Sequence, residues 1–330
     1  MRKTIITWSI LGAVFLFHLS GASSVLADAA PAQKTGFLVL APDRGFLGNQ
    51  EIQRLFEDFE KDYPAALALA GRQYDGVDNE YAVYLKQAIQ SLKGRGFSEI
   101  VVLPLFLSAS DPVLLTVVQH LPAYAVGTPV RFASAMSESH LTAQILLDRV
   151  TEASRDPEQE HVVILGAGAV NEADEAGLRA DLEPLLSYVK RYHPFKSVEL
   201  GIYYDRSAEA VLKEKKNQAV DDLVIRTTAK KGHTIVVPLL IGPKFDNQMS
   251  MTHWLSSKFK EFELSFVKQD ILPHPNLLLW LKKTAHAYLP ASPQETGVVI
   301  MPHGATQPYN DVVEQVIAPL QSAYRIEMAY

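Results

Sequence analysis

The sequence predicts an α/β protein made of two repeated domains, each with a parallel sheet flanked by helices, followed by part of a third repeat. Short apolar runs without alternation recur along the chain, as in parallel strands covered on both faces. Stretches with helical apolar spacing separate these runs, and this order is typical of parallel sheets with right-handed crossovers. The order begins again near residue 161 and near residue 297, which indicates internal repeats.

The composition narrows the class of protein. The chain has 330 residues, of which 48% are hydrophobic, and a length of this kind normally divides into more than one domain. A net charge of −6 argues against nucleic acid as a partner, because phosphate binding needs a clustered basic face. The chain has no cysteine, so any metal must be held by His, Asp, Glu or backbone oxygen.

Residues 1–27 are predicted to be a signal peptide. Arg2 and Lys3 precede an apolar run, Ile5 to Leu19, and small residues before Ala27 suit cleavage after that position. The prediction is an exported, periplasmic protein with no stable membrane span once the peptide is removed. An uncleaved membrane anchor is the alternative, because the apolar run approaches the lower length limit for a span.

The first repeat is predicted within residues 28–155. Its first strand, 37–41, is continuously apolar and ends at the turn Pro42-Asp43-Arg44-Gly45. Its most apolar strand is 100–107, and Asp111-Pro112 then opens a helix. The other predicted elements are a helix with apolar residues at 52–59, a strand at 66–71, a helix over 81–92 that stops at Gly94, a weak strand at 130–133 and a helix over 138–153.

The second repeat is predicted at 160–290, after a polar, proline-bearing boundary at 155–160. Its first strand, 161–166, is followed by Gly166-Ala-Gly168, which resembles the start of a dinucleotide-binding fingerprint. Asn171 stands where the third glycine belongs, so a plain tight turn is favoured. The later predicted elements are a helix with its apolar face at 178–189, a strand at 198–203, a charged helix at 208–230 and a central strand at 234–241.

Local matches support a common ancestry of the two repeats. Val101-Val-Leu-Pro-Leu105 matches Ile235-Val-Val-Pro-Leu239, and Gln73-Tyr-Asp75 matches Tyr203-Tyr-Asp205. A third repeat is predicted at 296–330. It has a strand from Gly297, a Pro302-His303-Gly304 turn, a helix and a strand at 325–329. Three explanations of this partial repeat are open: the rest was lost, the sequence is a fragment, or the half-unit completes the sheet of a neighbouring domain.

Four motifs carry a resemblance to a known family. They are Val102-Leu-Pro-Leu-Phe-Leu-Ser108, Val236-Val-Pro-Leu-Leu240, Pro273-His274-Pro275 and Pro302-His303-Gly304-Ala305. In their order and spacing they resemble the sirohydrochlorin cobaltochelatase and ferrochelatase family, the small class II tetrapyrrole metal chelatases. The resemblance covers essentially the whole mature chain and implies chelatase-like, Rossmann-like domains.

The sequence departs from the family at the expected catalytic histidines. In the first repeat the two histidines of the family fall near Pro42 and Pro112. In the second repeat they fall near Ala167 and around Phe245 or Asp246. Only the third repeat keeps the first histidine, as His303.

The resemblance implies that His303 is both catalytic base and metal ligand. A neutral imidazole, with an ordinary pKa of about 6.5, can take pyrrole protons or deliver a divalent ion. Glu327, on the strand after His303, is the predicted carboxylate beside it and a candidate metal ligand; an exposed edge-strand residue is the alternative. The metal is a substrate, Co²⁺ or Fe²⁺, and no organic cofactor is implied.

Two further residues are candidates for binding the macrocycle. Arg44 could hold a substrate carboxylate, with an internal ion pair or solvent exposure as the alternative. His274 lies in the Pro-His-Pro motif, and a hydrogen bond to a loop carbonyl is its alternative role. The lysines at 213–216 and 230–231 could attract the carboxylates of sirohydrochlorin, or form a solvated helix face.

Two functions are compatible with these residues. The first is an exported chelatase that inserts cobalt or iron into a sirohydrochlorin-like tetrapyrrole with His303. The second is a non-catalytic exported protein of the same fold that binds a tetrapyrrole or metal for delivery. In either case the expected partner is a small tetrapyrrole and not a nucleic acid, and a homo-oligomer is possible.

Overall fold

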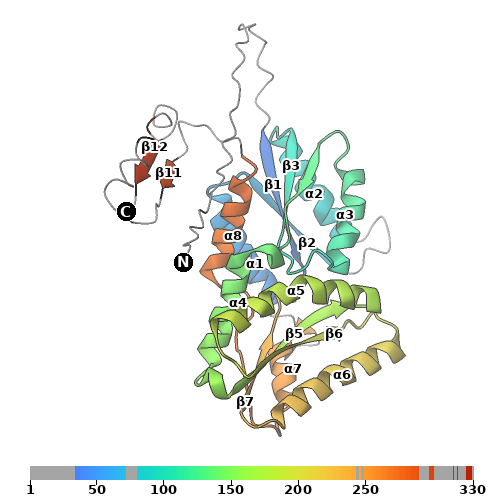
Figure 1. Cartoon of the computed structure of the whole chain (residues 1–330). Coiled ribbons are helices and arrows are strands. Elements are labelled where there is room, and N and C mark those ends of the chain that lie inside the picture. The colour runs from blue at the N-terminus through green and yellow to red at the C-terminus, as the bar shows by residue number, and fades with distance from the viewer. Residues whose placement is uncertain are drawn as a thin grey trace, which may run out of the picture. The chain divides into compact units, whose positions relative to one another are not determined.

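The computed structural model describes residues 34–71, 80–242, 245–246, 249–289, 297–300, 315, 318 and 325–328. Within this part of the chain, two four-stranded parallel sheets form the predicted α/β architecture (Figure 1). The first sheet has the order β2-β1-β3-β4. Its strands are β1 (Thr35–Pro42), β2 (Ala65–Ala70), β3 (Glu99–Pro104) and β4 (Val130–Phe132).

The second sheet repeats this plan. Its strands are β5 (Glu160–Ala169), β6 (Ser197–Tyr204), β7 (His233–Pro238) and β10 (Leu264–Phe266). Their order is β10-β7-β5-β6, which is the first-sheet order when β5 is matched to β1, β6 to β2, β7 to β3 and β10 to β4. The two repeats inferred from the sequence are therefore confirmed as two copies of one fold.

Helices cover both faces of each sheet. The first repeat contains α1 (Gly45–Glu60), α2 (Glu80–Gly94), α3 (Pro112–Tyr124) and α4 (His140–Ala153). The second contains α5 (Glu172–Tyr192), α6 (Ala210–Thr228), α7 (Met251–Lys258) and α8 (Pro275–His286). Short 3₁₀ turns at Met136–Glu138 and Pro157–Gln159 precede α4 and β5.

The continuous apolar runs follow from this double coverage. Along β1, Phe37 and Val39 belong to the core that contains Phe59 of α1, whereas Leu38 and Leu40 belong to the core of α2 and α3. Because successive side chains of a strand point to opposite faces, a strand covered on both faces must be apolar at every position. The same alternation holds in β5, whose side chains divide between the core with α5 and the core with α6.

The last helix of each repeat packs on the sheet of the other repeat. Helix α8 contacts α1 and β3, and its Leu277, Trp280 and Leu281 share a core with Phe37. Lys282 of α8 also pairs with Asp62 of the first repeat. Helix α4 in turn contacts α5 and β7 (Figure 1). The two repeats are consecutive in sequence, but their final helices are exchanged in space.

Two short pairs complete the described strands. β11 (Gly297–Ile300) and β12 (Arg325–Met328) pair in parallel, in the manner of β1 with β2 and β5 with β6. This pair agrees with the strands predicted for the third repeat. The predicted helix between them lies outside the described residues, apart from positions 315 and 318. β8 (Phe245–Asp246) and β9 (Met249–Ser250) form an antiparallel pair.

One local prediction was wrong. Gly166-Ala-Gly168, expected to be a tight turn after a strand, lies inside β5, which continues to Ala169. The pairing register with β6 shifts between Ala167 and Ala169, and Gly168 has a φ of 128°. The glycine therefore serves an irregularity within the strand, since an L side chain rarely adopts that φ.

The predicted signal peptide, residues 1–27, lies outside the described residues. Among the described helices, none is both long and apolar enough to cross a membrane.

Candidate functional site

The two domains meet through side chains and loops that follow the carboxyl ends of their strands. We call this contact the seam and define it by Arg44, Ser108, Ser110, Asp181 and Gly242. Arg44 follows β1, Ser108 and Ser110 follow β3, and Gly242 follows β7. In open α/β sheets, ligands bind beyond the carboxyl ends of the strands. The seam is therefore the candidate functional site in the described part of the chain.

Arg44 crosses the seam. It is 8% exposed, and its Nε and Nη2 atoms donate to the carbonyl oxygen of Gly242 at 3.0 and 2.8 Å. The guanidinium thus holds a loop of the other domain and is buried, so solvent exposure, one of its alternative roles, is wrong. Its predicted role in holding a substrate carboxylate stays a prediction.

Asp43, beside it, is fixed within the first domain. One carboxylate oxygen accepts from the Gly45 amide at 2.9 Å and from Nδ2 of Asn49 at 2.7 Å, and the other accepts from the Tyr81 hydroxyl at 2.6 Å. Gly71 allows this arrangement, because a Cβ there would lie 2.4 Å from the Tyr81 ring. The turn after β1 therefore carries a polar network anchored on α1 and α2.

Asp181 of α5 makes the second contact across the seam. Its Oδ2 atom lies 2.5 Å from Oγ of Ser108 and 2.9 Å from the amide nitrogen of Ser110, and both groups donate to it. Burial alone would raise the pKa of Asp181, but the hydrogen bonds from Ser108, Ser110 and Ala109 outweigh burial and lower it. Asp181 is accordingly held as a carboxylate.

Two carboxyl groups, the buried Asp270 and the half-buried Glu51, adjoin the seam. Asp270, in the segment after β10, is 7% exposed, and its Oδ1 has no hydrogen-bond partner; Oε2 of Glu51 also has none. Burial raises the pKa of Asp270 to about 7, opposed by Arg44 and Arg149 and reinforced by Glu51. Burial likewise raises the pKa of Glu51. Sequence reasoning missed both residues, because nothing in an isolated Asp or Glu signals that another domain will cover it.

His274 is the helix cap of α8. Its Nδ1 accepts from the Asn276 amide at 3.2 Å, and Nε2 lies 3.2 Å from Oδ2 of Asp148 on α4. Burial, and then the charge of Arg149, lower the pKa of His274. The motif opens helix α8, and the imidazole bonds an amide and a carboxylate and not a loop carbonyl. Its role toward a tetrapyrrole is still a prediction.

The predicted metal ligands are not brought to the seam by the described structure. His303 lies outside the described residues. Glu327 lies in β12 opposite Val299, and its side chain is also outside them. Across the described residues, no group of three or more His, Asp or Glu side chains is arranged to hold a metal ion.

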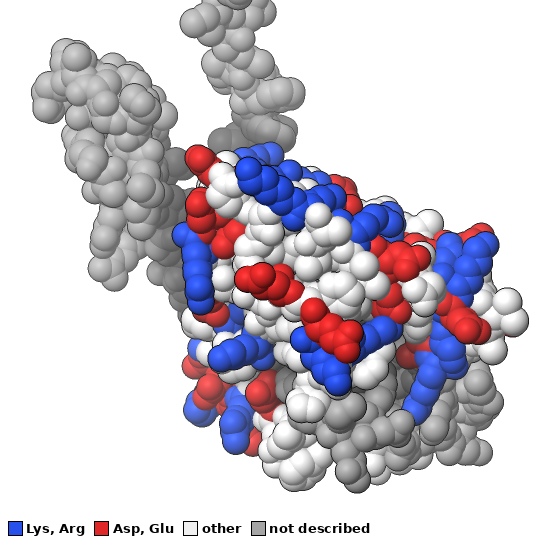
Figure 2. Space-filling view, turned by 90° about the horizontal axis from the view of Figure 1, so that it is seen from below, with Lys and Arg blue, Asp and Glu red and all other residues white. Residues whose placement is uncertain are grey.

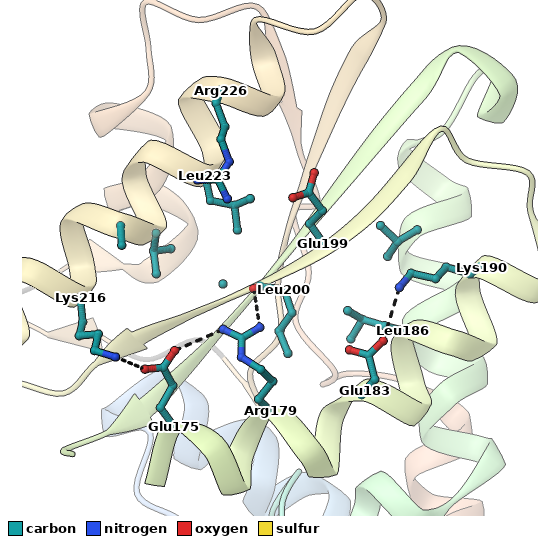
Figure 3. Close-up of a pocket in the computed structure, with 14 residues that line it drawn as sticks. Glu175, Arg179, Glu183, Leu186, Lys190, Glu199, Leu200, Lys216, Leu223 and Arg226 are labelled. Carbon is teal, nitrogen blue, oxygen red and sulfur yellow. Dashed lines mark hydrogen bonds and ion pairs between the residues drawn. The ribbon is translucent and has the colours of Figure 1, made fainter. Parts of the chain in front are cut away.

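A cavity of about 530 Å³ lies elsewhere, between α5 and α6 along β6 (Figure 3). β6 is an edge strand of its sheet. Arg179 donates from Nη1 to the Leu200 carbonyl at 3.1 Å, and Glu175 accepts from both Arg179 and Lys216. An edge strand with charged side chains over its backbone is protected against pairing with another strand. Of the residues predicted for the site only Lys216 lines this cavity, and it is paired with Glu172 and Glu175, so we assign the cavity a structural role.

The lysine-rich helix α6 has acidic neighbours. Lys216 pairs with Glu172 and Glu175, each at 3.0 Å, and Lys230 pairs with Glu199 at 2.7 Å. Figure 2 shows Lys and Arg side chains interspersed with Asp and Glu side chains on the face of the molecule drawn there. These pairs agree with the solvated helix face that was one of the two interpretations of the lysines.

Comparison with solved structures identifies the fold. The chain is similar to the sirohydrochlorin chelatase SirB from Bacillus subtilis subspecies spizizenii in complex with cobalt, with a TM-score of 0.53 and 11% identity. It is also similar to SirB from Bacillus subtilis with Fe³⁺, with a TM-score of 0.55 and 15% identity. Each alignment covers 77% of this chain and 94% of the other. No protein-family model matches the sequence, and no curated protein matches it significantly. The chain therefore has the chelatase fold that its motifs predicted.

Proposed function

We propose that this protein handles a tetrapyrrole and a divalent metal, and that it inserts Co²⁺ or Fe²⁺ into a sirohydrochlorin-like macrocycle. The observation that carries this proposal is the match of both domains, over 77% of the chain, to structures of sirohydrochlorin chelatases. Those structures were obtained with cobalt and with Fe³⁺, and the metal in the proposed reaction is a substrate.

His303 is the proposed reactive group. Metal insertion requires a base for the pyrrole protons and a ligand that releases the ion, and a neutral imidazole can serve as either. Its sequence context, a strand followed by Pro302-His303-Gly304-Ala305, is the one that resembles the family. Glu327 is the proposed carboxylate partner, which would orient the ring and reduce the charge cost of bringing a cation near it.

Arg44 and His274 are the proposed contacts for the macrocycle, and both are engaged in the closed seam or at its margin. We also propose export to the periplasm, on the basis of the basic, apolar and small-residue pattern of residues 1–27.

Delivery without insertion is the second candidate. It is favoured by the turn after β1, where the resemblance places the first family histidine near Pro42 and where Asp43 accepts three hydrogen bonds. A protein of this fold with no reactive imidazole between its two domains could still bind a macrocycle or an ion.

One assay separates the two functions. The protein without residues 1–27 is mixed with Co²⁺ and metal-free sirohydrochlorin, and the absorption change of the macrocycle is compared with the uncatalysed rate. Insertion predicts a faster change that His303→Ala abolishes and that His286→Ala, at an exposed position of α8, leaves intact. A faster change that survives His303→Ala refutes the role of His303. Binding of the macrocycle without any acceleration supports delivery.

A further inference from the structure

The loop Ser108-Ala109-Ser110 forms a group of donors at the carboxyl end of β3. The Ser108 hydroxyl and the Ser110 amide both donate to one carboxylate oxygen of Asp181. Ser108 is 1% exposed. A hydroxyl and an amide that converge on one oxygen can hold an anionic group, and we call this pair of donors the nest.

The occupant of the nest belongs to the other domain. Asp181 lies on α5, and Gly177, one turn earlier, lies against Ser110 so closely that a Cβ on Gly177 would be 2.8 Å from the Ser110 Cβ. Helix α5 therefore closes over the nest with its carboxylate directed into it. The carboxylate of Asp111 serves a separate purpose, because it accepts from the Val113 and Leu114 amides and caps α3.

The equivalent loop of the second repeat shows how this contact differs from its counterpart. Pro104 of β3 matches Pro238 of β7, so that Ser108 corresponds to Gly242. In each domain, the loop after this strand is bound by a residue of the other domain: Arg44, the residue before α1, binds Gly242, and Asp181 of α5 binds Ser108. At Gly242 the contact is a guanidinium on a carbonyl oxygen, whereas at Ser108 it is a carboxylate on hydroxyl and amide donors. The loop after β7 therefore offers an acceptor at this position, whereas the loop after β3 offers donors to which an exogenous anion could bind.

We propose that the nest is a carboxylate-binding site of the first domain, and that Asp181 fills it while the two domains are closed. A carboxylate-bearing ligand and the closed seam then compete for the same donors. The natural ligand would be a side-chain carboxylate of a tetrapyrrole. The choice of a tetrapyrrole rests on the proposed function, whereas the carboxylate-binding role of the nest does not. Binding at the nest would separate Asp181 from Ser108 and loosen α5 from the first domain.

The nest is tested by chemical rescue. Asp181→Ala leaves the donors without their carboxylate, so its melting temperature should fall, and sodium acetate should restore at least half of that loss relative to sodium chloride at equal ionic strength. Wild-type protein and the matched variant Asp222→Ala, on exposed helix α6, should gain no more from acetate than from chloride. Equal effects of acetate and chloride on Asp181→Ala would overturn the proposal. Equal rescue by inorganic phosphate would overturn the assignment to carboxylates.

A second variant covers the case in which Asp181→Ala does not fold. Asp181→Asn has nearly the same shape but is a weaker, neutral occupant, and it is expected to show the same selective stabilisation by acetate. If acetate stabilised Asp181→Asn no more than chloride does, the proposal would equally be overturned.

Coproporphyrin, a tetrapyrrole with several carboxylates, tests the competition. It should bind Asp181→Asn at least about tenfold more tightly than wild type, because the internal competitor is weakened. Similar affinity for both proteins would overturn the competition. Acetate rescue without any porphyrin binding would leave the nest supported and count against the proposed function.

Discussion

Asp270 provides a direct test of the buried charges beside the seam. Its carboxyl group is 7% exposed, one of its oxygens has no hydrogen-bond partner, and its pKa is raised to about 7 from 3.8. A raised pKa means that the folded state favours the protonated acid. The unfolding free energy should therefore fall as the pH rises from about 4 to about 7, and then level off. Asp270→Asn, which cannot ionise, should remove this dependence.

The magnitude follows from the shift. The pKa of Asp270 rises from 3.8 to about 7, which is a shift of roughly three units. At about 1.4 kcal/mol per unit, ionising Asp270 costs the folded state about 4 kcal/mol above neutral pH. We take this as an upper bound, because protein relaxation and water entry reduce the cost of a buried charge. Asp270→Asn should match wild type near pH 4 and exceed its stability by about 2–4 kcal/mol near pH 8.

Urea unfolding followed by circular dichroism across this pH range measures the difference. Asp156→Asn is the matched control, because Asp156 is exposed and the same chemical change there should alter stability by no more than about 0.5 kcal/mol. Parallel pH profiles for wild type and Asp270→Asn would refute the reasoning. Such a result would mean that Asp270 reaches water or a counter-charge in the folded protein.

Other predictions concern single contacts of the seam and the first domain. Arg44→Met should lower the unfolding free energy by about 1–3 kcal/mol at neutral pH, because the buried Gly242 carbonyl loses its donors; unchanged urea midpoints would contradict this. Gly71→Ala should cost about 1–3 kcal/mol, because the new Cβ displaces the Tyr81 ring. Gly94→Ala, with no atom within 4 Å of the new Cβ, should be neutral or slightly stabilising, and an equal loss in both variants would exclude the steric explanation.

Both repeats could be predicted from the sequence because strand and helix signals are local. A strand buried on both faces is apolar at every position, as at Phe37 to Ala41, and a helix has a period that its own residues display. The match of Val101–Leu105 with Ile235–Leu239 predicted one fold used twice, and both strands occupy equivalent places in their sheets. The resemblance to the chelatase fold was carried partly by these same two strands.

The error at Gly166-Ala-Gly168 also has a local origin. Glycine fits a turn and a strand irregularity equally well, and the sequence does not state which one the pairing with β6 requires.

The candidate site was harder to predict, because its contacts join residues far apart in the chain. Arg44 and Gly242 are separated by 198 positions, and Ser108 and Asp181 by 73. Neither Asp181 nor Asp270 stands in a motif. Each acquires its particular chemistry from groups that the other domain brings to it.

The sequence by itself determined the strands, the helices, the duplication and the type of fold, since each of these depends on residues close together or on direct similarity between segments. The tertiary structure decided which sheet each final helix covers, which carboxyl groups are buried, and which loop receives the carboxylate of Asp181. Burial and hydrogen bonding depend on what packs against a residue, and that is settled only when distant segments meet.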